Sequence, residues 1–286
     1  CIQFDLQAPE PAADAAHGLL DAPAAIAALD RLYGQAERWL DQLQILERAV
    51  DAAETPDEQT AYRFRIGGLW ESQLGDMVRA IESYREVLSH DPGHLPTIEA
   101  LDRIVHGDNE PMAAAQVLAP LYEQLAEWEH LIDVQEVMIA HTEDPETRIE
   151  RLHLVAQIHE RQVGEFDKAF AAYARALALD PQSENTIAQL ERLAEVTSEW
   201  EKYAQLLSEQ AAAVADPLVK VALLGRLAQT LELRLGNVDG AVERYLQILA
   251  IDPEHRESIA ALDRIFSNSQ RWPELVENLQ RQIAIT

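Results

Sequence analysis

The residue spacings in this chain that come nearest to a chemical motif are two Glu-x-x-His pairs. Glu127 and His130 form one pair, and Glu150 and His153 form the other. Residues three apart share one face of a helix, so each pair offers two ligands, as in carboxylate-bridged di-iron bundles. A di-iron site also needs two inward-facing glutamates from other helices. The simpler interpretation is favoured: these are exposed polar side chains in a chain with 50 acidic residues.

Motifs of nucleotide binding and of hydrolysis do not occur in the sequence. It contains no Gly-x-Gly-x-x-Gly, no phosphate loop ending in Gly-Lys-Ser/Thr, no nucleophile elbow and no His-Glu-x-x-His. The single cysteine, Cys1, cannot form an intrachain disulfide and cannot be placed in a catalytic triad. We therefore expect a protein that is not an enzyme and that holds no metal or cofactor.

The charge of the chain restricts its partners. Its 286 residues carry a formal charge of -27, and 48% of them are hydrophobic, which is enough for a core. A surface this acidic repels nucleic acid and anionic lipid, so a basic or neutral protein or peptide is the expected partner. No apolar run is long enough to span a membrane. We expect a cytoplasmic protein; the alternative is a periplasmic protein that is lipid-anchored through Cys1.

Three segments that begin at Leu74, Val163 and Leu235 align without gaps. In each segment an alanine lies five residues after a glycine, and a tyrosine lies four residues after that alanine. The proline of an Asp-Pro step lies eight residues after the tyrosine. These positions are Gly75, Ala80, Tyr84 and Pro92; Gly164, Ala169, Tyr173 and Pro181; and Gly236, Ala241, Tyr245 and Pro253.

The repeat unit is 72 residues long, because Leu29 lies 72 residues before Leu101 and Leu190 lies 72 before Leu262. Leu101 and Leu190 are 89 apart, and the surplus of 17 predicts one extra helix from Pro111, bent at Pro120. Its apolar stripe is Val117, Leu118, Leu121, Tyr122 and Leu125.

Helix start and stop signals divide each unit into four helices. Thr55-Pro56-Asp57-Glu58 is a capping box, and Asp-Pro steps at 144 and 216 repeat the cap followed by proline. The repeat glycines and the later Asp-Pro steps end helices. We expect about fifteen antiparallel helices between residues 22 and 285, no strands, and an irregular lead or linker over residues 1–21 that is rich in alanine and proline.

The alanine, tyrosine and proline positions resemble the second helix of the tetratricopeptide repeat, and the chain is similar to long bacterial proteins that tile this unit. In the first helix Glu71, Glu160 and Glu232 stand where the family usually has tyrosine. The resemblance implies an all-α fold, a right-handed α-solenoid of antiparallel helix pairs over residues 22–286. It also implies a non-enzymatic scaffold that binds a peptide or helix of a partner on its concave face.

The resemblance to the tetratricopeptide repeat implies that the concave face is formed mainly by the first helix of each pair. Counting back from the repeat alanines, it implies partner-binding positions at Tyr62, Arg65, Leu69, Gln73, Arg151, Arg161, Arg226 and Arg234. A row of arginines there would grip carboxylates of a bound segment. The alternative is that the arginines pair with acids one helical turn away.

The remaining expectations concern aromatic residues and the last helix. Recurrence in the repeat predicts that Trp39, Trp128, Trp200 and Trp272 belong to the core, whereas Trp70 is a candidate interface residue. The helix from about Arg271 carries an apolar stripe of Trp272, Leu275, Val276, Leu279 and Ile283. That stripe indicates a longer array, a partner or self-association through this helix. An alternative function is a lipid-anchored assembly factor of the cell envelope.

Overall fold

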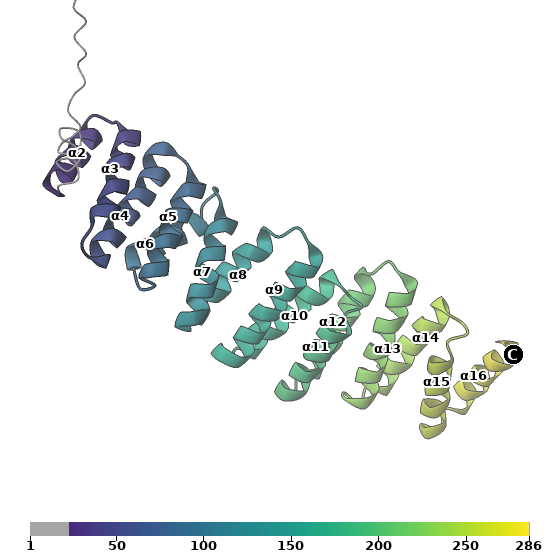
Figure 1. Cartoon of the computed structure of the whole chain (residues 1–286). Helices are drawn as coiled ribbons and strands as arrows, with labels where there is room; N and C mark the ends of the chain where they lie inside the picture. Colours follow the sequence, from purple (N-terminus) through teal and green to yellow (C-terminus); the bar gives the residue numbers. More distant parts are fainter. Residues whose placement is uncertain (1–22, 286) are drawn as a thin grey trace, which may run out of the picture. The chain divides into compact units, whose positions relative to one another are not determined.

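The computed structural model describes residues 23–285 and shows only helices as regular elements over that range (Figure 1). Two compact units divide the chain, an N-terminal unit of Cys1–His141 and a C-terminal unit of Thr142–Thr286. The boundary between them was not expected within the 22–286 solenoid. The predicted lead over residues 1–21 and Cys1, the residue of the alternative lipid anchor, lie outside the described residues.

Within the described part, the N-terminal unit consists of seven α-helices, which follow one another as antiparallel neighbours (Figure 1). The π-helical turn η1 extends α4. The helices are α2 (Pro23–Gln35), α3 (Trp39–Ala52), α4 (Pro56–Leu69) with η1 (Trp70–Leu74), α5 (Met77–His90), α6 (Leu95–Val105), α7 (Pro111–Leu125) and α8 (Trp128–Ala140).

Eight α-helices make up the described part of the C-terminal unit, and the π-helical turn η2 extends the first of them. They are α9 (Pro145–Ile158) with η2 (His159–Val163), α10 (Phe166–Leu179), α11 (Glu184–Thr197), α12 (Trp200–Ala213), α13 (Pro217–Leu233), α14 (Val238–Ile251), α15 (Arg256–Asn268) and α16 (Trp272–Ile285). Fifteen helices over residues 23–285 confirm the sequence prediction, and stacked helix pairs are the architecture of an α-solenoid. Its right-handed sense stays a prediction.

The helix starts lie where the capping signals place them. Thr55 accepts from the backbone of Glu58, whose side chain bonds back to the backbone of Thr55, so the capping box of α4 is complete. Asp144 and Asp216 cap α9 and α13 in front of their first-position prolines. Each of these caps satisfies backbone N–H groups that the first helical turn leaves unpaired.

Three repeat glycines turn the chain between paired helices. Gly75, Gly164 and Gly236 have φ of +68°, +80° and +63°, in the left-handed region that side chains with a Cβ adopt at a cost. In the first two copies the glycine ends a π-helical turn and its own N–H bonds back to the carbonyl of the first residue of that turn. The sequence predicted the turn but not the π-helical geometry before it.

The repeat alanines and tyrosines form the centres of the helix pairs. Ala80, Ala169 and Ala241 are completely buried, and so, nearly, are Tyr84, Tyr173 and Tyr245. The first and second helices of a pair approach closely because an alanine occupies the contact. The sequence interpretation of these positions is confirmed.

The extra helix of the N-terminal unit is α7, which packs between α6 and α8. Its described core side includes Leu118, Leu121 and Tyr122, as expected, with Ala114 and Ala115 completely buried beside them. At the two ends of the predicted stripe, Val117 is half-buried and Leu125 is exposed. The small alanines, rather than those larger residues, face the neighbouring helices.

Each repeat joins two successive first helices through a glutamate and an arginine that lie beside a buried tyrosine, and we call these the Tyr–Glu–Arg clusters. In the first, Glu71 accepts from the Tyr84 hydroxyl at 2.7 Å and from Arg103 at 2.7 Å. In the other two the arginine grips both carboxylate oxygens at 2.5–2.9 Å. The clusters are Tyr84–Glu71–Arg103, Tyr173–Glu160–Arg192 and Tyr245–Glu232–Arg264.

Burial and the adjacent carboxylate raise the pKa of each cluster tyrosine. Hydrogen bonding to the glutamate raises the pKa of each cluster arginine. The phenol therefore stays neutral and the guanidinium charged at any physiological pH. Glutamate at the position where the family usually has tyrosine supplies this tie.

The recurrent tryptophans are not core residues, contrary to expectation. Trp39, Trp128 and Trp200 are half-buried and Trp272 is 56% exposed. Each is the first residue of its helix. Trp70 packs against the buried cluster of Leu43, Leu46 and Ile66, and the Arg79 guanidinium lies 4.5 Å from its ring centroid.

The apolar stripe of α16 is exposed in the structure, with Trp272, Val276, Leu279 and Ile283 among the exposed large hydrophobic residues. Self-association through this helix stays a prediction. No helix in residues 23–285 has the length and apolar character that a membrane span requires.

Candidate functional site

The first helices of the C-terminal unit, α9, α11, α13 and α15, lie next to one another and form what we call the first-helix face. His153 on α9 bonds to Thr186 on α11 at 2.8 Å. Arg226 on α13 pairs with Glu184 on α11, and Arg264 on α15 with Glu232 on α13. Side-chain bonds therefore join every adjacent pair of helices on this face, which fixes the grooves between them.

The first groove, of about 260 Å³, lies between α11 and α13. Leu218 lines it and is 81% exposed, the largest exposure among the exposed large hydrophobic residues that the structure describes. Its acids are Glu184 and Asp216. Arg226 also lines it. Burial lowers the pKa of Arg226, but the hydrogen bond to Glu184 and the charges of Glu184 and Glu191 together raise it above its usual value.

The second groove, of about 560 Å³, lies between α13 and α15. Leu233, which is 69% exposed, and the small side chains of Ala260 and Ala261 give it an apolar lining. Glu257 and the carboxylate of Glu232 are its acids. Two adjacent grooves thus combine an exposed leucine with carboxylates, an arrangement suited to a segment that carries apolar and basic side chains.

The predicted positions of the N-terminal unit are mostly engaged in packing. Tyr62 and Leu69 are half-buried and pack against core clusters. Arg65 grips both oxygens of Asp30 on α2 at 2.6 and 2.8 Å. Gln73 is exposed and donates to the hydroxyl of its neighbour Ser72. Tyr62 also lines a groove of about 190 Å³ with Glu54 and Glu58.

The C-terminal unit holds the other four predicted positions. Arg226 pairs with Glu184 and, at 3.6 Å, with Glu191. Arg234 pairs with Glu195 at 3.1 Å and lies 4.5 Å from the Trp200 ring centroid. In the same unit Arg151 is half-buried and Arg161 is exposed.

Arginine partners on these faces come from neighbouring helices. The acids paired with Arg65, Arg226 and Arg234 precede them in the sequence by 35 to 42 residues. The alternative of pairs one helical turn apart is therefore wrong for these three. The arginine row as a carboxylate-gripping site stays a prediction, and ion pairs already hold three of its members.

Sequence reasoning missed Leu218 and Leu233. The available signal was their place in α13: Leu218 directly follows the first-position proline and Leu233 is the last residue of the helix. Both stand outside the buried stripe of Val219, Leu223 and Leu227.

The Glu-x-x-His pairs have other contacts. His130 stacks on Tyr122 with ring centroids 5.1 Å apart, and its Nδ1 is 3.6 Å from Glu127. His153 bonds to Thr186, and burial lowers the pKa of its ring. Within residues 23–285 no group of three or more His, Cys, Asp or Glu side chains is arranged to hold a metal ion.

A comparison with known protein families matches the tetratricopeptide repeat to residues 149–183. The match spans most of α9, all of η2 and α10, and ends just beyond Pro181. The chain therefore contains a tetratricopeptide repeat, which confirms the resemblance, and the same glycine, alanine, tyrosine and proline positions recur in α4–α5 and α13–α14. Repeats of this kind form extended protein-interaction surfaces.

Solved structures similar to this chain share little sequence with it, and a comparison with curated proteins finds no match. MamA is 18% identical, covering 70% of this chain and 96% of its own, with a TM-score of 0.27. PilF of Pseudomonas aeruginosa is 16% identical (82% and 94%, TM-score 0.27). TTC0263, a TPR protein of Thermus thermophilus, is 18% identical (73% and 97%, TM-score 0.27).

Proposed function

We propose that the chain is a non-enzymatic scaffold that binds a peptide or helix of a protein partner along the first-helix face of the C-terminal unit. The observation that carries this proposal is the pair of exposed leucines, Leu218 and Leu233, in adjacent grooves of one helix. A cytoplasmic location is part of the proposal. The lipid anchor at Cys1 is the alternative, and it would be tested by mass spectrometry of the native protein.

The chemistry of the partner follows from the linings. Burying one leucine side chain stabilises a complex by about 1.5–3 kcal/mol, so aliphatic or aromatic side chains of the partner belong on Leu218 and Leu233. Glu184, Asp216 and Glu257 leave carboxylate oxygens at the groove walls. Lysine or arginine side chains of the partner complement them, in agreement with the charge of -27.

A random peptide display library selected on the immobilised chain tests the proposal. We expect enriched peptides to combine aliphatic with basic residues and to compete with one another. Leu218→Ser and Leu233→Ser should each weaken their binding about tenfold, since each removes about 1.4 kcal/mol of apolar contact.

The matched control is Leu95→Ser, because Leu95 is also an exposed leucine near a helix start but lies in the N-terminal unit. It should leave peptide affinity unchanged. Enriched peptides whose binding is indifferent to both groove substitutions would refute the proposed site.

A further inference from the structure

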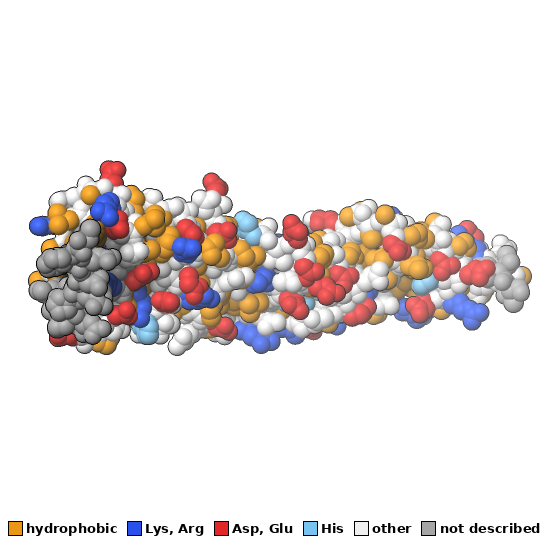
Figure 2. All heavy atoms as spheres, turned by 45° about the horizontal axis from the view of Figure 1, so that its top comes forward, with side chains coloured by type: hydrophobic (Ala, Val, Ile, Leu, Met, Phe, Trp, Pro, Cys, Tyr) orange, Lys and Arg blue, Asp and Glu red, His pale blue; other side chains and the backbone are white. Residues whose placement is uncertain are grey.

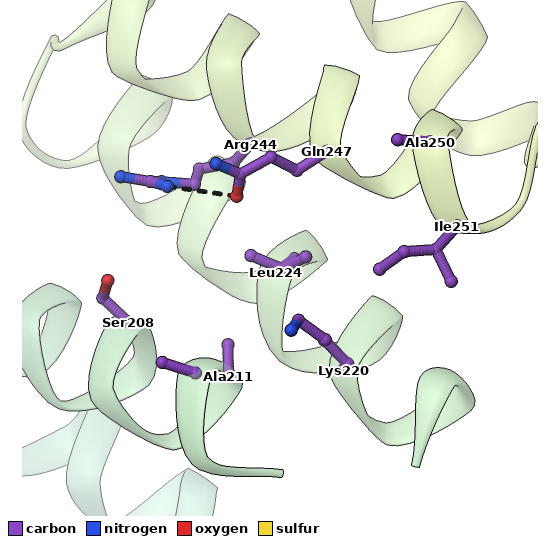
Figure 3. Close-up of a pocket in the computed structure, with 9 residues that line it drawn as sticks. Ser208, Ala211, Lys220, Leu224, Arg244, Gln247, Ala250 and Ile251 are labelled. Atoms are coloured by element: carbon purple, nitrogen blue, oxygen red, sulfur yellow. Dashed lines mark hydrogen bonds between the residues drawn. The ribbon is translucent and has the colours of Figure 1, made fainter. Parts of the chain in front are cut away.

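A third groove of the C-terminal unit shares no lining residue with the two grooves of the first-helix face. It is about 420 Å³ in volume and is formed by α12, α13 and the second helix α14 (Figure 3). Leu224 forms its centre, Ala211 and Ile251 stand on either side, and the side chains of Lys220 and Arg244 reach it from different helices (Figure 3). This combination brings two cations to an apolar surface.

Neither cation is neutralised by a neighbour. Within residues 23–285, neither Lys220 nor Arg244 forms an ion pair with a carboxylate, although most basic residues of the chain do. Arg244 donates one bond, to the Gln247 side chain at 3.0 Å, and its Nε atom is buried without a hydrogen-bond partner. Because Nε is closed off from the groove and Nη1 donates to Gln247, Nη2 is the nitrogen that remains to donate to a bound acceptor.

The absence of acids from this lining is unusual for the chain. The two grooves of the first-helix face and the groove beside Tyr62 each contain two acidic residues in their linings. Ser208 and Gln247 are the uncharged polar side chains here, and no Asp or Glu lines the groove. Acidic side chains are spread along the face shown in Figure 2, and the chain carries 50 of them, so a lining with two unpaired cations and no acid differs from the other grooves described above.

We propose that this groove binds a segment of a partner polypeptide that places one Asp or Glu side chain between Lys220 and Arg244. An aliphatic side chain of the same segment packs on Leu224 and Ile251. The charge complement of two unpaired cations is a carboxylate, which can accept from Nη2 of Arg244 and from the ammonium group of Lys220.

The occupant is an internal segment rather than a small acid. Ser208 and Gln247 offer a hydroxyl and an amide along the lining, which suit the N–H and C=O groups of a passing backbone. Leu218 and Leu233 do not line this groove, so it is independent of the proposed scaffold site.

Methyl-detected NMR of the full chain tests the proposal with three hexapeptides. The first is acetyl-Ala-Leu-Ala-Glu-Ala-Leu-amide, the second replaces Glu by Gln, and the third is the Gln peptide with a free terminal carboxylate. The Glu peptide should shift the methyl signals of Leu224 and Ile251 with a Kd of about 0.1–1 mM. The other two should bind at least about tenfold more weakly, since they lack the side-chain carboxylate.

Lys220→Gln and Arg244→Gln should each weaken binding of the Glu peptide several-fold. In the double variant, the methyl shifts should no longer reach saturation. Lys168→Gln is the matched control, because Lys168 is an exposed lysine of the same unit that pairs with Glu165. Unchanged thermal melting of each variant shows that it is folded. Equal binding of the Glu and Gln peptides, or binding that survives both substitutions, overturns the proposal. Tighter binding of the free-terminus peptide overturns the assignment to a side-chain carboxylate.

Discussion

The Tyr–Glu–Arg clusters predict an asymmetry between their two charged partners. In the second cluster the Glu160 side chain is only 12% exposed, whereas the Arg192 side chain is 41% exposed. Arg192→Met leaves a nearly buried carboxylate without its cation. Glu160→Gln leaves an arginine that can turn towards water. We expect the arginine substitution to destabilise the C-terminal unit more than the glutamate substitution does.

The magnitudes follow from the burial of the group left behind. Removing one partner of a buried ion pair costs about 3–5 kcal/mol, and a partly exposed pair costs less, so we expect about 2–4 kcal/mol for Arg192→Met. Glu160→Gln should cost about 1 kcal/mol, since the amide keeps one acceptor for Arg192. The three clusters can be ranked by the exposure of the glutamate side chain, which is 9% for Glu232, 12% for Glu160 and 18% for Glu71. Arg264→Met should therefore cost most and Arg103→Met least.

Urea denaturation followed by far-UV circular dichroism measures these differences as changes in the free energy of unfolding. Hydrogen exchange read by mass spectrometry assigns each loss to its own helices. A double-mutant cycle of Glu160→Gln and Arg192→Met isolates their coupling. The control is Arg85→Met, because Arg85 and Glu82 are both more than half exposed and their pair contributes little.

A larger loss for Glu160→Gln than for Arg192→Met would refute the reasoning from burial. So would a cost for Arg85→Met as large as that for Arg192→Met. The reverse ranking of the three arginine variants would show that exposure of the carboxylate does not set the energy of these ties.

The remaining predictions concern glycine and histidine positions. Gly67→Ala should destabilise the protein by about 1–3 kcal/mol, because its Cβ would stand 2.7 Å from Cδ1 of the Tyr84 ring. The Cβ of Gly225→Ala would meet no atom within 4 Å, so this substitution should stabilise the protein by about 0.5–1 kcal/mol. Thermal melting compares the two variants. Gly164→Ala at φ +80° should cost about 1 kcal/mol by urea denaturation, with Gly164→Asn costing less. Burial lowers the pKa of His153. The stabilising contribution of this histidine is therefore complete above the unfolded-state pKa of about 6.5 and is lost as the pH falls through the lower folded-state pKa. In urea denaturation, the His153→Gln variant should lose less stability on acidification than the unaltered protein does.

Local signals predicted the fold well because each one acts within a single turn. These signals act on adjacent backbone groups by capping helix starts or ending helices. They are the capping box at Thr55, the prolines after Asp144 and Asp216, and the repeat glycines. Pattern alone therefore predicted helix number and order. The π-helical turns before Gly75 and Gly164 were not predicted, since they depend on how the two helices of a pair pack.

The candidate site was harder to predict, because ion pairing depends on neighbouring helices. Counting back from the repeat alanines located Arg226 on the first helix, but nothing in that count indicates that Glu184 lies within reach. The prediction that the recurrent tryptophans belong to the core was wrong for a related reason. Recurrence at equivalent positions shows a shared role, and for Trp200 that role is at a helix start, under the Arg234 guanidinium, rather than in the core.

The glutamate and arginine of every Tyr–Glu–Arg cluster are 32 residues apart, so each tie is completed within one helix pair and the helix that follows it. The extra helix α7 enters after Arg103 and before Glu160, in the interval that no tie crosses. A helix added or deleted in such an interval leaves all three Glu–Arg pairs intact. We therefore expect related arrays to differ in length at these intervals rather than inside a tie.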